Sequence, residues 1–259
     1  MVRIQEIFNF IEELAPPNTA LDWDNCGLQV DSEKDRVKKV LLALDMSPET
    51  INEAENFKAE LIITHHPLIF SPLKSIRFNT PVGELVGRLI KAGIAHFAAH
   101  TNLDRSYKGT GFALAELLKL KNIQRYTDDE NDEMNMVITG EFENSLDETQ
   151  LVDILKNRLN CREIKLIGKT NRVKTLAILP GSGGSLLGKL KIRYDLIITG
   201  EASYHHALTA RQEGLYAAVI GHYYSEKPVM HNLKKLLTEK FPRLQIRVST
   251  NEGEPYRIM

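Results

Sequence analysis

The feature that most limits how this chain can fold is a strand-like sequence that occurs twice. Leu-Ile-Ile-Thr stands at residues 61–64 and again at 196–199, each time after an acidic residue. The same offset of 135 positions places 41–44 onto 176–179, so a second apolar segment is repeated with the first. A shared offset over two apolar segments indicates repeated supersecondary structure. We therefore expect two similar lobes.

The first copy predicts a strand, a helix and a second strand. An apolar run at 40–44 is followed by Ser47, Pro48 and Glu49, which are typical of a helix N-terminus. We expect a helix over about 48–59 and the strand 61–64 after it. Strands joined by a helical crossover form parallel sheets covered by helices. The predicted fold class is α/β, with two similar, interleaved three-layer α/β/α lobes and mainly parallel sheets.

The repeat also predicts how the chain is divided. An amphipathic helix opens the sequence over 4–14, and the amphipathic stretch 151–159 would be its second copy. A polar, acidic run at 126–133 separates the copies and is typical of a solvated linker. We expect the first lobe at 1–127 and the second at 134–259, interleaved as one structural unit.

The composition excludes several classes of protein. With 259 residues, 42% of them hydrophobic and 26% charged, the chain can bury a core, which excludes a disordered, collagen-like or disulfide-scaffold protein. The formal net charge of -1 provides no attraction to nucleic acid or to an anionic membrane. No apolar run approaches the ~20 residues that span a bilayer, and the acidic opening helix does not resemble a signal peptide. Two distant cysteines favour a reducing cytoplasm.

Histidines are concentrated at the ends of predicted strands in the first lobe. His65 and His66 directly follow the strand 61–64, and His100 and Asp104 follow the apolar segment that ends at 99. Ligands bind at the carboxyl ends of strands in open α/β sheets, so this position indicates a site. The alternative is ordinary loop chemistry, in which the histidines are polar loop residues and Asp104 caps a helix or turn.

The second lobe repeats this arrangement. His222 follows a small-residue strand and Glu226 comes four residues later, where Ser225 can cap a helix and Glu226 can complement its dipole. Taken together, three histidines and two carboxylates suit two divalent ions of zinc, iron or manganese that bind and activate a water. The predicted metal ligands are His65, His66, Asp104, His222 and Glu226.

Other polar residues of the second lobe have two interpretations each. Glu201, His205 and His206 are expected at a helix start or pocket wall, where substrate contact and a structural role are equally compatible with the sequence. The glycine-rich segment 181–185 is predicted to be a flexible turn rather than an anion cradle, because it lacks the lysine of a P-loop. His96 and His231 are expected to be structural or exposed to solvent.

Four segments carry a resemblance to a known family. The chain resembles the Nif-three-like family in its short form, whose bacterial members are labelled GTP cyclohydrolase type-two homologues. The resemblance implies interleaved α/β/α lobes, a toroidal homohexamer built as a trimer of dimers, and dinuclear metal sites on the same five ligands. The segments that carry it are 22–30 (DWDNCGLQV), 64–70 (THHPLIF), 99–104 (AHTNLD) and 221–226 (GHYYSE).

Two functions follow from this resemblance. The first is a hydrolase in which activated water attacks a purine ring carbon or a phosphoester of a small molecule, with His100, Glu201 or His206 moving protons. The second is a non-catalytic, metal-binding ring that acts as a scaffold or regulatory interaction protein. Neither involves a membrane. Nucleic acid is a poor partner for either unless Lys74, Arg77 and Lys108 gather on the inner face of the ring.

Overall fold

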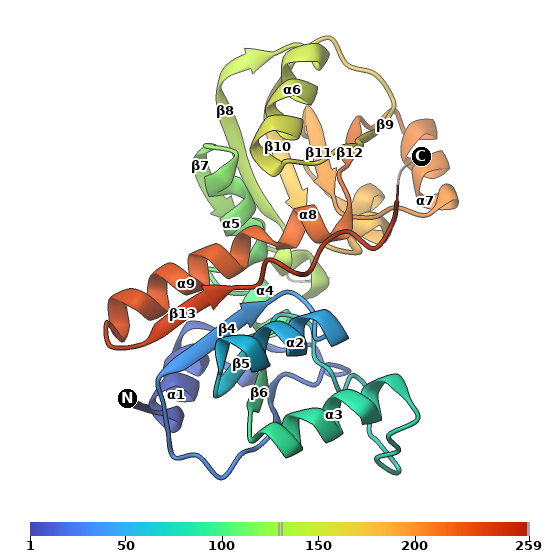
Figure 1. Ribbon diagram of the computed structural model, residues 1–259. Helices are drawn as coiled ribbons and strands as arrows, with labels where there is room; N and C mark the ends of the chain where they lie inside the picture. Colours follow the sequence, from blue (N-terminus) through green and yellow to red (C-terminus); the bar gives the residue numbers. More distant parts are fainter. Residues whose placement is uncertain (129, 131, 258–259) are drawn as a thin grey trace. The chain divides into compact units, whose positions relative to one another are not determined.

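The computed structural model describes residues 1–128, 130 and 132–257, which form two compact units (Figure 1). The first unit comprises Met1–Gly109 and Met230–Gly253, and the second comprises Thr110–Val229 and the C-terminal residues from Glu254. These units divide the chain elsewhere than the predicted lobe bounds, 1–127 and 134–259, which remain a prediction. Each unit is built from two separate stretches of chain.

The predicted linker at 126–133 belongs to the second unit. Residues 129 and 131 lie outside the described residues, but Tyr126 and Asp128 are buried, and Tyr126 packs in an apolar cluster of this unit. The backbone N–H of Lys191 donates to the Tyr126 hydroxyl, and the Lys191 ammonium group contacts the Asp128 carboxylate at 3.2 Å. The other described residues of this segment, Thr127, Glu130, Asp132 and Glu133, are exposed, so the segment is solvated in part and anchored to the second unit at Tyr126 and Asp128.

The first unit contains a five-stranded sheet that is parallel except at one edge. Only β2 runs antiparallel to its neighbour, β6. A separate two-stranded ribbon joins β1 (Val2–Arg3) to β3 (Arg36–Val37). In spatial order the sheet is β13 (Gln245–Val248), β4 (Lys39–Ala43), β5 (Leu61–Thr64), β6 (Ala95–Ala98) and β2 (Gly27–Val30).

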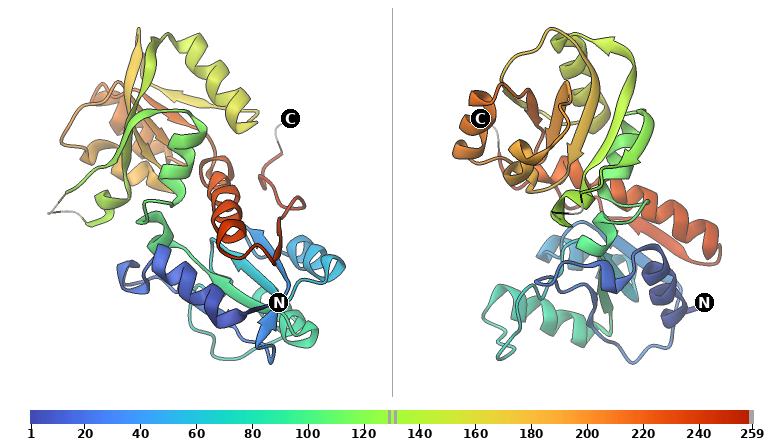
Figure 2. Two further views of the ribbon diagram at one scale, coloured as in Figure 1. Left: turned by 90° about the vertical axis from the view of Figure 1, so that its left-hand side faces the viewer. Right: turned by 180° about the vertical axis from the view of Figure 1, so that it is seen from behind.

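Helices cover both faces of this sheet (Figure 2). Phe8 of α1 (Ile4–Leu14) stacks on Phe97 of β6 with ring centroids 4.9 Å apart. On the opposite face, α2 (Pro48–Phe57) and α3 (Pro81–Ala92) enclose apolar side chains that include Leu41 and Ile62. The remaining helical segments with residues in this unit are η1 (Pro17–Thr19), α4 (Thr101–Asp104) and α9 (Pro228–Lys240).

The predicted helix behind the first strand is confirmed and ends earlier than expected. The Ser47 hydroxyl accepts a hydrogen bond from the backbone N–H of Thr50, which caps α2 at its N-terminus. The helix ends at Phe57 rather than at residue 59, because Lys58 takes a left-handed conformation with φ 58°. Ala59 then donates its backbone N–H to the Ala54 carbonyl, so the helix end is satisfied before β5 begins.

The second unit contains a six-stranded mixed sheet, and the prediction of mainly parallel sheets is wrong for it. Only β10 with β11 and β11 with β12 are parallel. The long strand β8 pairs antiparallel with both β7 and β10, a geometry that short connections permit. The order is β7 (Lys121–Arg125), β8 (Ile138–Leu146), β10 (Val173–Leu179), β11 (Leu196–Thr199), β12 (Ala217–Val219) and β9 (Lys165–Ile167).

This sheet also carries helical segments on both faces. Apolar residues of α5 (Thr110–Leu117) and α6 (Glu148–Leu159) pack with Leu176 and Leu196 on one face. The other face, with Ala177 and Ile197, is covered by η3 (Gly183–Lys189) and α7 (Tyr204–Gln212). The second unit thus has three layers, as the first has. Its other helical segments are η2 (Asp132–Met136) and α8 (His222–Glu226).

The two sheets share a four-strand pattern. The order β4-β5-β6-β2 in the first matches β10-β11-β12-β9 in the second, with the same strand directions. Residues 61–64 and 196–199 occupy equivalent strands, as predicted. The α6 helix precedes β9 in the chain as α1 precedes β2, which agrees with the expectation that it copies the opening helix.

The repeat offset predicted for the first strand is wrong by one residue. In β4 the partner of Leu61 is Val40, whereas in β10 the partner of Leu196 is Leu176, an offset of 136 rather than 135. An acidic residue precedes each of β5 and β11, and the backbone groups that these two carboxylates contact are also 136 positions apart. Glu60 accepts from the backbone N–H groups of residues 38 and 39, and Asp195 from those of residues 174 and 175.

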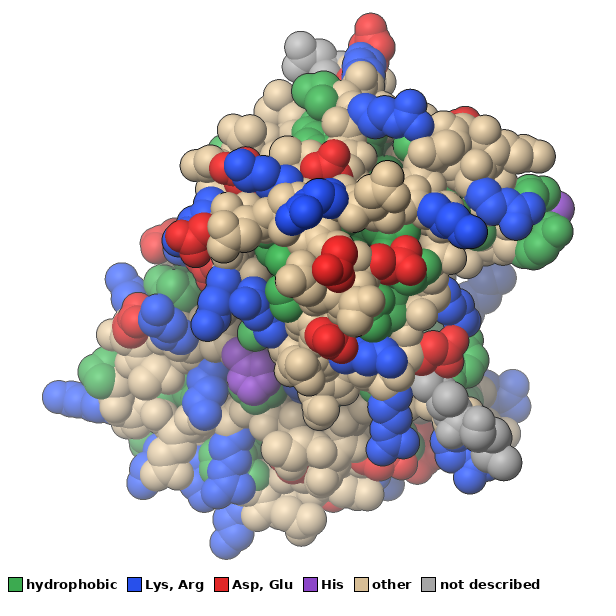
Figure 3. Space-filling view, turned by 90° about the horizontal axis from the view of Figure 1, so that it is seen from above, with side chains coloured by type: hydrophobic (Ala, Val, Ile, Leu, Met, Phe, Trp, Pro, Cys, Tyr) green, Lys and Arg blue, Asp and Glu red, His purple; other side chains and the backbone are tan. Residues whose placement is uncertain are grey.

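The surface is mixed in charge. On the face shown in Figure 3, lysine and arginine side chains are interspersed with aspartate and glutamate side chains. Among the described residues, no helix combines the length and the apolar character that crossing a membrane requires.

Candidate metal centre

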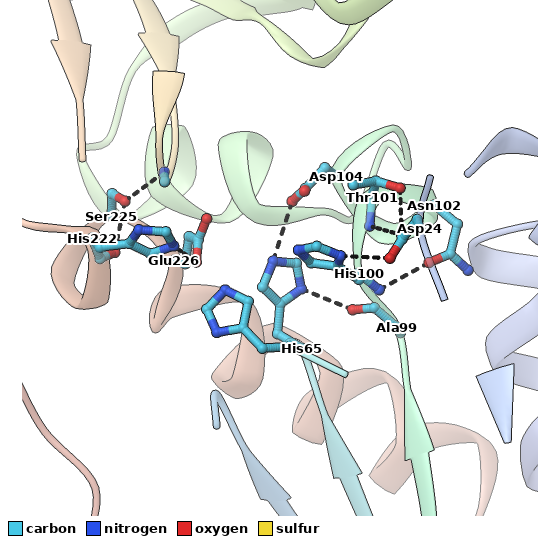
Figure 4. Close-up of polar contacts among 12 residues, drawn as sticks. Asp24, His65, Ala99, His100, Thr101, Asn102, Asp104, His222, Ser225 and Glu226 are labelled. Carbon is cyan, nitrogen blue, oxygen red and sulfur yellow. Dashed lines mark hydrogen bonds and ion pairs between the residues drawn. The ribbon is translucent and has the colours of Figure 1, made fainter. Parts of the chain in front are cut away.

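Three histidines of the first unit converge beyond the ends of two adjacent parallel strands. Figure 4 labels two of them, His65 and His100. His65 and His66 follow β5, and His100 follows β6. Backbone pairing continues past the strands, because the N–H of His65 donates to Ala43 and the N–H of Ala99 donates to Thr64. One ring nitrogen from each histidine lies within 4.8 Å of the others.

Each of these histidines is oriented by an oxygen acceptor. A carbonyl or ionised carboxylate oxygen can only accept, so it places the ring proton on Nδ1 and leaves Nε2 as the nitrogen that would ligate a metal. This is the arrangement that holds metal-binding histidines in proteins, and the residues therefore fit a divalent ion. The contacts, each 2.8 Å long, are His65 Nδ1 to Ala99 O, His66 Nδ1 to Asp45 Oδ1 and His100 Nδ1 to Asp24 Oδ1.

Asp24 is held as a carboxylate at this centre. It accepts hydrogen bonds from His100 and from the backbone N–H and hydroxyl of Thr101. Burial raises the pKa of Asp24, but the hydrogen bonds from His100 and Thr101 and the attraction of His100 outweigh this effect, and the pKa falls from 3.8 to about 2. Asp24 belongs to the segment 22–30 that carried the family resemblance, and sequence reasoning assigned it no role.

Asp45 is positioned by the C-terminal part of the first unit. The backbone N–H groups of Leu44 and Asp45 donate to one carboxylate oxygen of Glu252, at 2.8 and 3.2 Å. This places Asp45 beside His66, although Glu252 lies 207 residues further along the chain. No local pattern links these residues, so sequence reasoning missed both.

Asp104 lies next to His65. Its Oδ1 atom is 3.6 Å from His65 Nε2, and its side chain is 16% exposed. The short helix α4 positions it, since the backbone N–H of Asp104 donates to the carbonyl of His100. The structure thus brings the predicted ligands His65, His66 and Asp104 into one cluster with His100, for which a proton-transfer role was predicted.

In the second unit, His222 lies between two carboxylates. Its Nε2 is 3.0 Å from Glu226 Oε2, and its Nδ1 is 3.2 Å from Glu201 Oε1. Glu226 is buried with 5% exposure, whereas the Glu201 side chain is half exposed. Two predicted ligands, His222 and Glu226, therefore lie together with Glu201, for which a pocket-wall role was one prediction.

The prediction that Ser225 caps a helix is wrong. Ser225 lies inside α8, and α9 begins only at Pro228. The Ser225 hydroxyl donates to the His222 carbonyl at 2.8 Å and accepts from the backbone N–H of Gly181 at 2.9 Å. The hydroxyl of Ser225 thus links α8, the helix that carries His222 and Glu226, to the turn after β10.

Two glycines explain why the second unit has no histidine pair after β11. Gly200 stands at the repeat position of His65, where a Cβ atom would lie 2.5 Å from the Gly181 carbonyl oxygen and 2.6 Å from the Ser225 hydroxyl. Gly181 has φ +58°, and a Cβ there would lie 2.2 Å from a Glu226 carboxylate oxygen. The glycine-rich segment therefore begins as a tight turn against a carboxylate and continues into η3 from Gly183, which disfavours its alternative role as an anion cradle.

The other four histidines have different surroundings. His205 and His206 are exposed at the start of α7, where the backbone N–H of His206 donates to Ser203 as a helix cap. His96 is buried in β6 with its Nε2 2.8 Å from the Thr64 hydroxyl, and burial lowers its pKa to about 3. His231 is exposed on α9. These positions agree with the structural or solvent-facing roles expected for His96 and His231.

The fold and the donors define an α/β protein with mixed sheets and a histidine-rich candidate metal centre at the ends of parallel strands. Residues 2–255 match the family described as Duf34/NIF3 (NGG1p interacting factor 3), and the chain belongs to this family. The family resemblance noted in the sequence is thereby confirmed.

Relatives and solved structures match over nearly the whole chain. A protein of Clostridium perfringens named GTP cyclohydrolase 1 type 2 homolog is 33% identical over 262 residues, which cover 100% of both chains. A Staphylococcus aureus protein of known crystal structure is 26% identical with a TM-score of 0.91, covering 100% of this chain and 99% of the other. Reduced HcgD from Methanocaldococcus jannaschii is 28% identical with a TM-score of 0.82, covering 95% and 97%.

Proposed function

We propose that this protein is a dinuclear metal-dependent hydrolase that acts on a nucleotide or another phosphate-containing small molecule. The observation that carries the proposal is the convergence of His65, His66 and His100, whose ring nitrogens lie within 4.8 Å of one another while oxygen acceptors hold each Nδ1. The nucleotide follows from relatives named GTP cyclohydrolase 1 type 2 or its homologue.

The proposed cofactors are two divalent ions per chain, of zinc, iron or manganese. The family resemblance assigns their ligands to His65, His66 and Asp104 of the first unit and to His222 and Glu226 of the second. Nitrogen and oxygen donors suit these metals. When bound, such an ion pair lowers the pKa of a water and polarises a substrate oxygen.

The chain itself supplies groups that can move protons. Asp24 holds the Nδ1 proton of His100, so His100 Nε2 is the atom that would accept or donate a proton. Glu201 contacts His222 and has an exposed carboxylate that can serve the same role. His206 is the third proposed proton carrier, on the exposed start of α7. His100 is also close enough to His65 and His66 to be a metal ligand. The variant His100→Ala distinguishes metal binding from proton transfer by this residue.

The wider context of the proposal comes from the sequence and the family resemblance. We propose a cytoplasmic homohexamer, built as a trimer of dimers, and an origin of the two similar sheets by internal duplication. The matching order of β4-β5-β6-β2 and β10-β11-β12-β9 supports the duplication.

Metal content and turnover test the proposal together. The wild-type protein, His65→Ala, Glu226→Ala and His100→Ala would be purified without added metal or chelator and assayed for GTP ring opening, with His231→Ala as a matched histidine control. We expect about two ions per chain in the wild type and control, and loss of metal and product in the first two variants. If His100 only moves protons, its variant keeps metal and loses product.

Other outcomes would contradict the proposal. Two ions per chain without product on GTP or a phosphoester would favour a non-catalytic metal-binding ring. A wild-type protein that holds no metal even after readdition would contradict the metal centre itself.

A further inference from the structure

Two exposed aromatic side chains stand beside His100 in the first unit. Trp23 is 54% exposed and Phe70 is 53% exposed, and their ring centroids are 5.7 Å apart. The centroid of the His100 ring lies 6.0 Å from that of Trp23 and 6.5 Å from that of Phe70. The edge of the candidate metal centre thus carries two large ring surfaces that the core does not use.

Hydrogen bonds connect the two loops that carry these rings. The Asn25 side-chain amide donates to the Ile69 carbonyl at 2.5 Å, and the backbone N–H of Ile69 donates to the Gln29 side chain at 3.2 Å. Gln29 also donates to the Asn25 carbonyl at 2.7 Å. Side-chain amides therefore tie the segment that carries Trp23 to the segment that carries Phe70. The neighbour of Trp23, Asp24, is anchored in turn by His100 and Thr101.

We infer that Trp23 and Phe70 form a stacking surface for the planar heteroaromatic ring of the substrate. Aromatic side chains have few rotatable bonds and so lose little entropy when a flat ring stacks on them, and such stacking is selective for aromatic ligands. The surface borders His100, so a ring stacked there would lie beside the candidate metal centre. This inference rests on the proposed function and narrows the substrate class to compounds with an aromatic base.

The chain carries its own reporter for this site, because Trp23 is its single tryptophan. Guanosine and ribose 5-phosphate would be titrated into the full-length protein, as purified and after metal loading, while tryptophan fluorescence is recorded. We expect saturable quenching by guanosine and none by ribose 5-phosphate. Phe70→Ala should raise the guanosine Kd about 5- to 150-fold, the range for losing one stacking ring, and Phe70→Tyr should restore binding.

Phe78→Ala is the matched control, because Phe78 is a 62% exposed phenylalanine that packs over Gly87 and Lys91 instead of His100. Equal effects of Phe70→Ala and Phe78→Ala, or no quenching by guanosine, would overturn the stacking surface. So would a Phe70→Ala variant that changes the mass of the assembly in ultracentrifugation without changing guanosine binding, since the rings would then form a contact between copies of the chain.

The same titration separates this inference from the proposed hydrolase. Guanosine binding that needs Phe70, in a protein without turnover, would support the stacking surface and contradict the hydrolase. Turnover of GTP with an unchanged KM in Phe70→Ala would support the hydrolase and overturn the stacking surface.

Discussion

At the scale of single residues, the histidines differ in their hydrogen-bond partners. His65, His66 and His100 each place Nδ1 against an oxygen, which leaves Nε2 for a ligand. His96 lies in the same sheet, yet it is enclosed in the core and contacts a hydroxyl. The first kind of contact suits a histidine that could hold a metal ion, whereas the second makes a neutral core residue.

His96 should make the protein sensitive to acid. Its folded pKa of about 3 lies below the ordinary 6.5, so the unfolded chain binds the proton first. The contribution of neutral His96 to the free energy of unfolding is therefore fully present above about pH 6.5. It is lost as the pH falls from there toward 3, by roughly 1.4 kcal/mol per pH unit. We expect urea unfolding of His96→Gln to depend less steeply on pH between about 7 and 5. Equal slopes in wild type and variant would contradict this.

Asp45→Ala should weaken metal binding without unfolding the protein. Asp45 is exposed at its side chain and accepts from His66 Nδ1, so its loss removes orientation from one proposed ligand. Removing such a partner lowers metal affinity roughly 10- to 100-fold. Competition against a chromogenic chelator measures the change, and circular dichroism checks the fold. An unchanged metal affinity would show that Asp45 does not orient His66.

At the scale of elements, the equivalent strands β5 and β11 are followed by different residues, because a neighbouring turn packs closely against the end of β11. β5 is followed by two histidines, whereas β11 is followed by Gly200 and Glu201. The turn after β10 approaches Gly200 so closely that no side chain fits there. The second unit instead presents His222 from α8, after β12.

Gly200→Ala should therefore destabilise the second unit. The added methyl group would meet backbone and hydroxyl atoms at 2.5 and 2.6 Å, which forces the turn away from α8. We expect a loss of about 1–3 kcal/mol in the free energy of unfolding, typical of overpacking, measured by urea denaturation. Gly253→Ala is the control, since nothing lies within 4 Å of a Cβ atom there. Equal stabilities of the two variants would contradict the close packing.

At the scale of the whole molecule, each unit carries proposed ligands of its own. The first holds His65, His66 and Asp104, and the second holds His222 and Glu226. A metal that binds only the folded chain stabilises it by mass action.

Metal should accordingly raise the Tm of the wild-type protein and a chelator should lower it. At a free metal concentration 100 times the Kd, the stabilisation is about 2.7 kcal/mol. Differential scanning calorimetry of His65→Ala should show no such shift, because a proposed ligand is missing, while His231→Ala should respond as the wild type does. A shift of equal size in His65→Ala would place the metal elsewhere.

The local elements and the residue types of the centre could be predicted from the amino-acid sequence. Periodicity and capping located α2, β5 and β11, because these depend on residues adjacent in the chain. The positions of His65, His66 and His100 after strands followed for the same reason. The mixed character of the second sheet could not be predicted in this way. The direction of β8 relative to its neighbours depends on its antiparallel pairing with β7 and β10, and the residue pattern of β8 does not reveal these partners.

The contacts that orient these residues, and the packing that excludes side chains, arise from the three-dimensional fold. Asp24 reaches His100 across 76 positions, and Glu252 reaches the loop of Asp45 across 207. The one-residue shift in the repeat and the exclusion of a side chain at Gly200 are likewise set by register and packing. Such contacts depend on which strands lie side by side in space. The positions of two residues along the chain do not show whether their strands are neighbours.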